Sequence, residues 1–400
     1  MKDFDRELER RLDELRQQGL SRSLRRIDSH QGTKVQIAGK WLLNFSSNDY
    51  LGLANDERLK EAALEAINQY GTGSGASRLI CGSLAPHHEL EETLAVFKNC
   101  EAALAFSSGY ATALGTIRAL LGKEDLIILD KLVHASIVDA ARLSGAKIRI
   151  FAHNDLNELE DILKSARAGG SATRGTKTLI VTESVFSMDG GLAPLAQIVE
   201  LKEKYGAWLM LDEAHSTGLY GVGGAGLASQ LGLGNQIEVQ MGTLGKALGA
   251  AGGYICGSRV LIEFLINRAR SFIFSTAMVP AASAAATAAI QLVQTSEGER
   301  RRKLLWERVA EVARLVDGNV AEPSSAILPM VIGDEAAAMG IAAALFGRGI
   351  FIPGIRYPSV PRGQARLRIT VTADHTSEQV RTLGKALEEL AQPSGAAAQV

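Results

Sequence analysis

The 400-residue sequence predicts an α/β protein, with a mostly parallel sheet in a large domain and a smaller α+β domain at the C-terminal end. From about residue 100, short apolar segments alternate with segments of helical periodicity, and strands separated by helices favour parallel pairing. Several of these segments are apolar without alternation, which is typical of strands buried on both faces. The expected strands are AALAFSS, DLIILD, KIRIFAH, TLIVTES, AWLMLDEAH, IEVQMGT and GGYICG.

Two flanking regions complete the expected organisation. Phe4, Leu8, Leu12 and Leu15 fall on one helical stripe, so the chain is expected to open with an amphipathic helix, followed by the arginine-rich segment SRSLRRI. Beyond residue 290, a charged amphipathic helix (SEGERRRKLLWERVAEVARLV) and two strands (AILPMVIGD and ARLRITVTA) indicate a separate α+β unit. We therefore predict an N-terminal helix and arm over 1–44, a large α/β domain over 45–290 and a C-terminal α+β domain over 291–400.

Composition and charge argue against several classes of function. A formal net charge of −1 gives no electrostatic footprint for nucleic acid or for an anionic membrane. The N-terminus is highly charged and lacks an apolar signal region, and the most apolar segment, AMVPAASAAATAAIQLV, reads as a buried helix. Three cysteines without metal-type spacing fit a reduced compartment. We expect a cytoplasmic protein with no metal site, no nucleic-acid partner and no membrane association.

Polar residues gather where five of the expected strands end. In open α/β sheets, ligands bind at the carboxyl ends of the strands, and packing alone does not require polar side chains there. In chain order these residues are Ser107, Ser108, Gly109 and Tyr110; then His134; then Glu183, Ser187 and Asp189; then Asp212 and His215; and finally Thr243 and Lys246. The sequence therefore predicts a binding site at this edge.

Lys246 lies in the stretch MGTLGKALGAAGG, whose other residues are mostly too small to cover it. A surface lysine in a flexible loop is the simplest interpretation. A lysine partly removed from water has a lowered pKa, however, and its neutral amine can then act as nucleophile or base. Asp212 ends an apolar strand, where it could cap a helix or form a buried ion pair. Together, the two residues suit pyridoxal 5'-phosphate (PLP), which needs a lysine for its Schiff base and an acid opposite its pyridine nitrogen.

A competing motif is GVGGAG, residues 221–226, which matches the GxGxxG pattern of dinucleotide-binding folds. It begins nine residues beyond Asp212, and no acidic residue stands about twenty positions further on. The sequence also lacks a GxxxxGK[ST] phosphate loop, so dinucleotide and nucleotide chemistry are disfavoured.

Several motifs together resemble the α-oxoamine synthases, PLP-dependent enzymes of fold type I. TLGKALGAAGG is similar to the family's cofactor-lysine motif, LDEAHSTGLYGVGGAG to its Asp-Glu-Ala-His block, and TESVFSMDGGLAPL to the block before it. The resemblance extends from about residue 20 to 390. It implies a PLP-dependent acyltransferase with a large, mostly parallel sheet domain and a smaller C-terminal domain.

The resemblance also implies roles for residues around PLP. Lys246 would hold the cofactor and act as the base, Asp212 would pair with the pyridine nitrogen, and His134, otherwise a buried core histidine, would stack on the ring; these three would be the catalytic residues. The remaining cofactor contacts would be His215 at the ring hydroxyl, then Gly109, Tyr110, Ser187 and Thr243. In this family a Ser/Thr pair from the neighbouring subunit helps to bind the phosphate, and Ser275 and Thr276 match it. The family pattern thus implies a homodimer with shared active sites.

The substrate residues implied by the family are fewer. Asn48 and Arg368 would hold the amino acid's carboxylate beside His134, unless Arg368 is an arginine that alternates with Arg366 toward solvent. Arg22 and Ser359 match positions that contact the acyl thioester, and Arg25 or Arg26 could replace Arg22 under a small shift of alignment. Two positions depart from the family: Ala113 replaces a usual asparagine, and Ser359 a usual threonine.

Within the family, NFSSNDYLGL and RYPSVPRGQARLRITVTA favour condensation of L-alanine with a pimeloyl thioester, releasing CO₂ and the free thiol, in biotin biosynthesis. The acyl carrier, CoA (pimeloyl-CoA) or an acyl-carrier protein (pimeloyl-acyl-carrier protein), stays open. Two alternatives remain: a glycine-using relative such as 2-amino-3-ketobutyrate CoA ligase or 5-aminolevulinate synthase, and a PLP-binding protein without catalysis.

Overall fold

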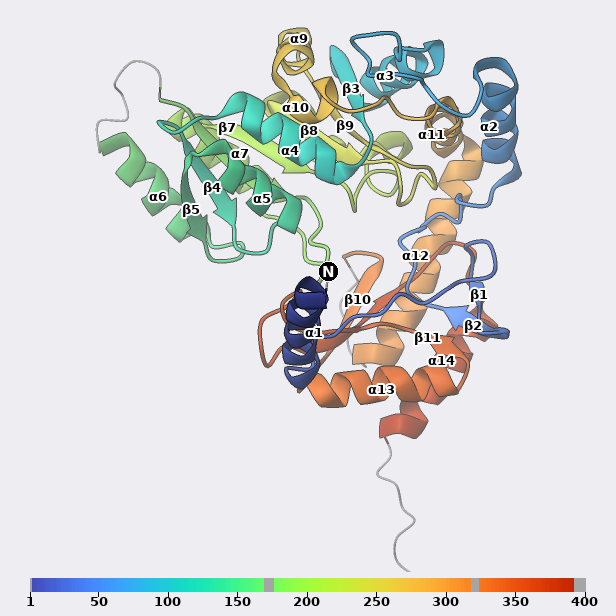
Figure 1. Ribbon diagram of the computed structural model, residues 1–400. Coiled ribbons are helices and arrows are strands. Elements are labelled where there is room, and N and C mark those ends of the chain that lie inside the picture. The colour runs from blue at the N-terminus through green and yellow to red at the C-terminus, as the bar shows by residue number, and fades with distance from the viewer. Residues whose placement is uncertain (1, 169–175, 318–323, 392–400) are drawn as a thin grey trace, which may run out of the picture.

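The central feature of the fold is a seven-stranded sheet with the order β3-β9-β8-β7-β6-β4-β5 (Figure 1). A computed structural model describes residues 2–168, 176–317 and 324–391. The strands are β3 (Ala102–Phe106), β4 (Leu126–Asp130), β5 (Lys147–Phe151), β6 (Thr178–Glu183), β7 (Trp208–Asp212), β8 (Val239–Thr243) and β9 (Gly253–Gly257). Strand β9 runs antiparallel to both of its neighbours, β3 and β8, and the other four pairings of the sheet are parallel. All seven predicted strands and the mostly parallel pairing are confirmed.

Helices cover both faces of this sheet, as the uniformly apolar strands require. In β4, Ile127 and Leu129 join a core with helices α4 and α5, whereas Ile128 joins a second core with α6 and α7 on the opposite face. This alternation follows from the twofold side-chain period of a strand. The helices around the sheet are α4 (Gly109–Leu120), α5 (Ala135–Ser144), α6 (Leu156–Ala168), α7 (Leu195–Tyr205), α8 (Leu227–Gln230), α9 (Arg259–Arg268) and α10 (Arg270–Ile273).

Helix α11 (Pro280–Val293) packs against α2 (Glu57–Tyr70) and α3 (Ala85–Lys98). Its residues Ser283, Ala286, Ala289 and Ile290 have no exposed surface, so the alanine-rich segment is the buried helix that the sequence predicts. Among the described residues, no helix is long and apolar enough to cross a membrane.

The C-terminal region contains α12 (Ser296–Asp317), β10 (Ile327–Gly333), α13 (Glu335–Gly347), β11 (Ile350–Phe351), β12 (Gly354–Ile355), β13 (Ala365–Thr370) and α14 (Ser377–Ala391). Strands β10, β13 and β12 form an antiparallel sheet. Strand β11 instead pairs with the N-terminal hairpin of β1 (Lys34–Ile37) and β2 (Lys40–Asn44). The two ends of the chain thus share a sheet, which the sequence patterns did not predict. The domain boundaries at 44 and 290 stay predictions.

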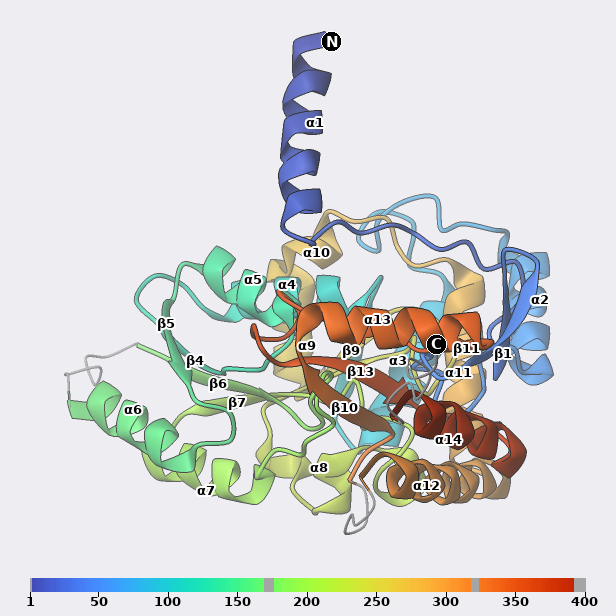
Figure 2. The same cartoon turned by 90° about the horizontal axis from the view of Figure 1, so that it is seen from below.

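Helix α1 (Lys2–Gln17) projects away from the rest of the chain (Figure 2). Its predicted apolar stripe is open to solvent in the single chain, with Phe4, Leu8, Leu12 and Leu15 between 40% and 66% exposed. The arm that follows is held at Arg356, whose guanidinium donates to the carbonyl oxygens of Gly19 (2.9 Å) and Ser21 (3.0 Å).

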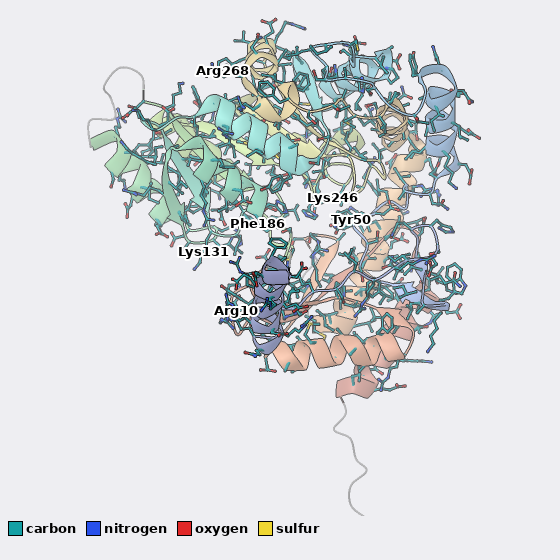
Figure 3. All side chains as sticks on the ribbon, in the orientation of Figure 1. Arg10, Tyr50, Lys131, Phe186, Lys246 and Arg268 are labelled. Carbon is teal, nitrogen blue, oxygen red and sulfur yellow. The ribbon has the colours of Figure 1, made fainter. Side chains whose placement is uncertain are left out.

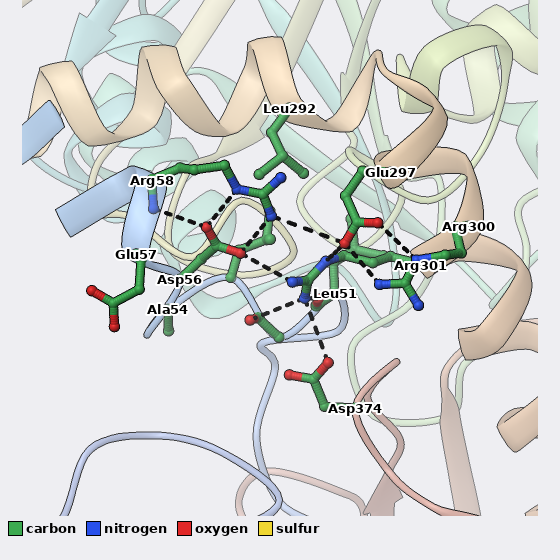
Figure 4. Close-up of polar contacts among 12 residues, drawn as sticks. Leu51, Ala54, Asp56, Glu57, Arg58, Leu292, Glu297, Arg300, Arg301 and Asp374 are labelled. Carbon is green, nitrogen blue, oxygen red and sulfur yellow. Dashed lines mark hydrogen bonds and ion pairs between the residues drawn. The ribbon is translucent and has the colours of Figure 1, made fainter. Parts of the chain in front are cut away.

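Arg301, at the start of α12, ties residues 51–56 to the C-terminal region (Figure 4). Its Nη1 donates to the carbonyl oxygen of Leu51 (2.7 Å) and lies 3.5 Å from Asp374 Oδ1, while Nη2 donates to Asp56 Oδ2 (3.0 Å). Because the guanidinium of Arg301 is a rigid fork with five donors, this side chain can hold residues 51–56 and Asp374 at a fixed spacing from α12.

Candidate active site

A cavity of about 180 Å³ lies at the carboxyl ends of β6, β7 and β8. Eight of the predicted site and strand-end residues meet here with three others. Its lining residues are Gly109, Tyr110, His134, Ser136, Glu183, Asp212, Ala214, His215, Met241, Thr243 and Lys246. A larger cavity of about 670 Å³ lies near the amino ends of β7 and β8, and it contains none of the predicted site residues. The strand-end rule therefore locates the polar cavity, which is not the largest one.

Lys246 stands in the loop after β8, and its Nζ donates to Thr243 Oγ1 at 3.1 Å. Burial lowers the pKa of the Lys246 amine, against the opposing effect of the Asp212 and Glu183 carboxyls. The glycines around it have a second role besides leaving room for a ligand. A Cβ on Gly249, which has a φ of +62°, would lie 2.4 Å from the carbonyl carbon of Leu53. The loop can thus pack backbone to backbone against Leu53 and Ala54.

Asp212 and Glu183 end adjacent parallel strands in register, so the two buried carboxyls lie side by side. Asp212 Oδ1 accepts a hydrogen bond from the Ala214 amide (2.9 Å), whereas Glu183 Oε1 has no partner among the described residues. Burial raises the pKa of both carboxyls, and the Asp212 charge raises that of Glu183 further. The sequence placed Glu183 at a strand end but assigned it no role. Its burial beside Asp212 appears only in the fold.

Both predicted histidines are in the cavity wall and are neutral near pH 7. His134 precedes α5, and its Nδ1 accepts from the Ser136 amide at 3.2 Å; burial lowers its pKa. Burial lowers the pKa of His215 well below its ordinary value, with Lys246 and Arg368 adding to the effect. His215 Nδ1 lies 2.7 Å from the hydroxyl of Tyr50, a residue that sequence reasoning missed.

Arg368 is buried, so its alternative interpretation as a solvent-facing strand residue is wrong; Arg366 is buried as well, because β13 is covered on both faces. The Arg368 Nε donates to the Ser187 carbonyl oxygen (2.6 Å) and its Nη1 donates to Asn48 Oδ1 (3.0 Å). Asn48 and Arg368 thus meet although they are 320 residues apart. The contact of Ser187 in this network is through its backbone.

The remaining predicted residues lie outside the Lys246 cavity of their own chain. Ser275 and Thr276 line a separate cavity of about 20 Å³. Arg22 and Ser359 are exposed and lie on neighbouring segments joined by Arg356. Arg25 stacks over the Phe346 ring at 4.8 Å, and Arg26 pairs with Asp28 at 2.5 Å. Arg25 and Arg26 are therefore engaged within the chain.

The motif GVGGAG has a structural explanation. Glu213 is fully buried, pairs with Lys98, and accepts from the Ala228 amide at 3.0 Å. Gly226 has a φ of +119°, and a Cβ there would lie 2.5 Å from Glu213 Oε1. The glycines let this loop wrap around a buried ion pair beside Asp212.

The chemistry of the cavity fits PLP. A lysine with a lowered pKa suits the aldehyde, and a buried carboxylate suits a protonated ring nitrogen. Neutral imidazoles suit an aromatic face and a ring hydroxyl. The N-terminus of the 12-residue helix α4, at Gly109 and Tyr110, suits a phosphate. The unpartnered Glu183 Oε1 is a further polar atom at the cavity.

Comparison with known proteins gives a consistent result. Residues 40–387 match the model of the family described as aminotransferase class I and II. The chain is 46% identical over 391 residues to the 8-amino-7-oxononanoate synthase of Geobacter sulfurreducens, covering 96% of this chain and 97% of the relative. The enzyme of that name from Anaeromyxobacter dehalogenans is 47% identical over 371 residues, covering 92% and 91%.

Solved structures extend the similarity to three dimensions. A serine palmitoyltransferase from S. paucimobilis matches with a TM-score of 0.88 and 29% identity over 97% of both chains. The 8-amino-7-oxononanoate synthase of Francisella tularensis matches with a TM-score of 0.72 and 28% identity, covering 87% of this chain and 98% of that one.

Proposed function

The chain belongs to the family of class I and II aminotransferases, and from this premise we propose that it catalyses the 8-amino-7-oxononanoate synthase reaction. It is a PLP-dependent acyltransferase that condenses L-alanine with a pimeloyl thioester in biotin biosynthesis. A bond forms between the alanine Cα and the thioester carbonyl carbon, the thiol leaves, and the alanine carboxylate departs as CO₂. The observation that carries this proposal is 46% identity over nearly the full length of both chains.

We propose a role for each PLP contact. Lys246 would hold the cofactor, Asp212 would pair with its ring nitrogen, His134 would cover the ring face, and His215 would contact the ring hydroxyl. Gly109 and Tyr110 at the start of α4 would face the phosphate, while Thr243 and Ser187 would contribute polar contacts. When bound, PLP supplies an electron sink for the electron pair left at the amino acid's Cα.

Lys246 and Arg368 would act on different parts of the amino acid, Lys246 on its Cα and Arg368 on its carboxylate. The Arg368 fork and Asn48 would bind and orient its carboxylate. Lys246 Nζ would take the Cα proton and later return one, which requires a neutral amine; its burial favours that form.

A second copy of the chain would complete the site. Ser275 and Thr276 lie outside the Lys246 cavity of their own chain, and Phe274 beside them is 71% exposed. We propose a homodimer in which this segment reaches the phosphate bound in the partner's cavity. Arg22 and Ser359, both exposed on adjoining segments, would meet the acyl thioester at the entrance.

The test is thiol release by the PLP-loaded protein offered pimeloyl-CoA with L-alanine or with glycine, with pimeloyl-acyl-carrier protein as a parallel donor. Release that depends on L-alanine and is weak with glycine is the expected result. Release from acetyl- or succinyl-CoA with glycine would keep the family and replace the substrate assignment. Absence of release from every pair would overturn the catalytic proposal in favour of a PLP-binding protein.

A further inference from the structure

Tyr50 is completely buried at the junction between the large sheet and the C-terminal region, near Lys246 (Figure 3). Its hydroxyl lies 2.7 Å from His215 Nδ1 and 3.2 Å from Asn48 Oδ1. Asn48 Oδ1 also accepts from Arg368 Nη1 at 3.0 Å. A chain of hydrogen-bonding groups therefore runs from Arg368 through Asn48 and Tyr50 to His215, in which the single Tyr50 proton can serve only one of its two neighbours at a time.

The donors and acceptors in this chain restrict where its protons lie. Arg368 can only donate, and Asn48 Oδ1 can only accept. The Arg368 guanidinium also faces the Tyr50 oxygen, where it opposes the effect of burial, which raises the pKa of Tyr50 to about 12. Tyr50 therefore keeps its single proton, which it can donate to Asn48 Oδ1 or to His215 Nδ1 but not to both, and the shorter of the two contacts is the one to His215 Nδ1.

A hydrogen bond from Tyr50 to Nδ1 determines the form of His215. Because His215 is buried and neutral, its ring carries one proton, and a proton-accepting Nδ1 leaves that proton on Nε2. His215 lines the Lys246 cavity, so Nε2–H is the group that it presents there. The same tyrosine hydroxyl also contacts Asn48, the partner of Arg368.

The backbone around Tyr50 is held from several sides. Its carbonyl oxygen accepts from the Ala373 amide at 2.8 Å, and the neighbouring Asp49 carboxylate accepts from the Leu53 amide at 2.8 Å. Arg301 holds the Leu51 carbonyl oxygen on the outer side. A side chain fixed in this way can set the orientation of its partners with little entropic cost.

Resting on the function proposed above, we propose that Tyr50 is a positioning residue that holds His215 as the Nε2–H tautomer and couples it to the Asn48–Arg368 pair. Hydrogen-bond donation to the ring oxygen of PLP is then linked to binding of the amino acid's carboxylate. Loss of the Tyr50 hydroxyl would therefore alter the binding of both PLP and the amino acid, although Tyr50 itself lies behind the residues that line the cavity.

A matched control separates this role from simple loss of a buried hydroxyl. Tyr254 is also completely buried. Its hydroxyl lies 2.8 Å from Thr217 Oγ1 and is not part of the chain of hydrogen-bonding groups that joins Arg368 to His215. Burial raises the pKa of both tyrosines. Tyr50→Phe and Tyr254→Phe therefore remove comparable hydroxyls from comparable surroundings.

The experiment compares the PLP-loaded full-length wild type with Tyr50→Phe and Tyr254→Phe. The readouts are the pH midpoint of the cofactor absorbance, the dissociation constant of L-alanine from spectral titration, KM and kcat, and Tm. For Tyr50→Phe we expect the pH midpoint to rise, because a ring oxygen that loses a donor becomes more basic. We also expect L-alanine binding to weaken by about five- to tenfold, because the Arg368 guanidinium, which faces the Tyr50 oxygen, would lose an acceptor that orients it. Both variants should lower Tm, and by similar amounts, because each loses one buried hydroxyl. Tyr254→Phe should leave the pH midpoint near that of wild type and the dissociation constant of L-alanine within about twofold of it.

Asn48→Ala provides a second variant, on the Arg368 side of Tyr50 in the chain of hydrogen-bonding groups. Asn48 does not contact His215, so a shift of the cofactor midpoint in Asn48→Ala, together with weaker L-alanine binding, would support the coupling. An unchanged midpoint in both Tyr50→Phe and Asn48→Ala would overturn the inference. Failure of wild type to release thiol would instead overturn the proposed function, and the spectral comparison of the two tyrosine variants would still decide the role of Tyr50.

Discussion

The candidate site has two walls of different origin. The first wall lines the Lys246 cavity, comes from neighbouring strand ends of the large sheet, and carries Lys246, Asp212, Glu183 and His134. The second wall lies behind the lining residues, where residues 44–53 and β13 bring Asn48, Tyr50 and Arg368 together from opposite ends of the chain. The first wall follows from sheet topology, whereas the second depends on contacts such as the Thr370 amide with the Phe45 carbonyl oxygen (3.0 Å).

The walls also differ in electrostatic character. In the sheet wall, burial lowers the pKa of Lys246 and raises those of Asp212 and Glu183, so its groups are poised to exchange protons or to meet a charged ligand. In the second wall, Arg368 is a permanent cation already oriented by Asn48 and the Ser187 carbonyl oxygen. Substitutions in the sheet wall should therefore affect the chemical step, and those in the second wall should mainly affect amino-acid binding.

The largest effect is expected for Lys246→Ala, in the sheet wall. Loss of the proton-transferring amine should lower kcat by about a thousandfold or more, since positioned acid–base groups contribute rate factors of this order. Thiol release and cofactor absorbance, measured on the same preparation, give the result. Condensation at the wild-type rate would show that Lys246 is not the base.

An intermediate effect is expected for Arg368→Lys. Lysine keeps the charge but has no planar fork, so it cannot contact Asn48 and a carboxylate in the same geometry. The KM for L-alanine should rise by about 10- to 100-fold, equivalent to the loss of about 1.5–3 kcal/mol from one charged hydrogen bond. The affinity for PLP should change little. A fall in kcat with unchanged KM would remove the distinction between the two walls.

The smallest effect is expected for Arg301→Met, which acts on the second wall from outside. It removes the contacts to Leu51, Asp56 and Asp374 that hold the segment carrying Asn48 and Tyr50. We expect a rise of about three- to tenfold in the KM for L-alanine, a lower Tm, and an unchanged affinity for PLP.

Arg300→Met is the matched control for Arg301→Met. Arg300 is on the same helix and pairs with Glu297 as Arg301 does, but its side chain is 58% exposed. An exposed ion pair of this kind contributes little to stability, so its loss should leave Tm and KM near the wild-type values. Equal effects of the two substitutions would mean that the contacts of Arg301 do not order the second wall.

The sequence by itself determined the strands of the large sheet and the edge of that sheet at which the polar site residues lie. Buried strands have no polar face, so their apolar runs stand out, and polar residues at their ends mark a binding edge without further information. This is why Lys246, Asp212, His134 and His215 could be placed together from their positions at or after the ends of strands β4, β7 and β8. The family resemblance supplied Asn48 and Arg368, which no local pattern joins.

Only the tertiary structure decided the features that depend on distant contacts. The antiparallel direction of β9, the pairing of β11 with β2, the burial of Arg366 and the packing of GVGGAG around Glu213 have no local signature. The contacts of Tyr50 with His215 and Asn48 belong to the same class. Hydrophobic periodicity reports which face of an element is buried, but the partner on that face is selected by packing and hydrogen bonding across the whole chain.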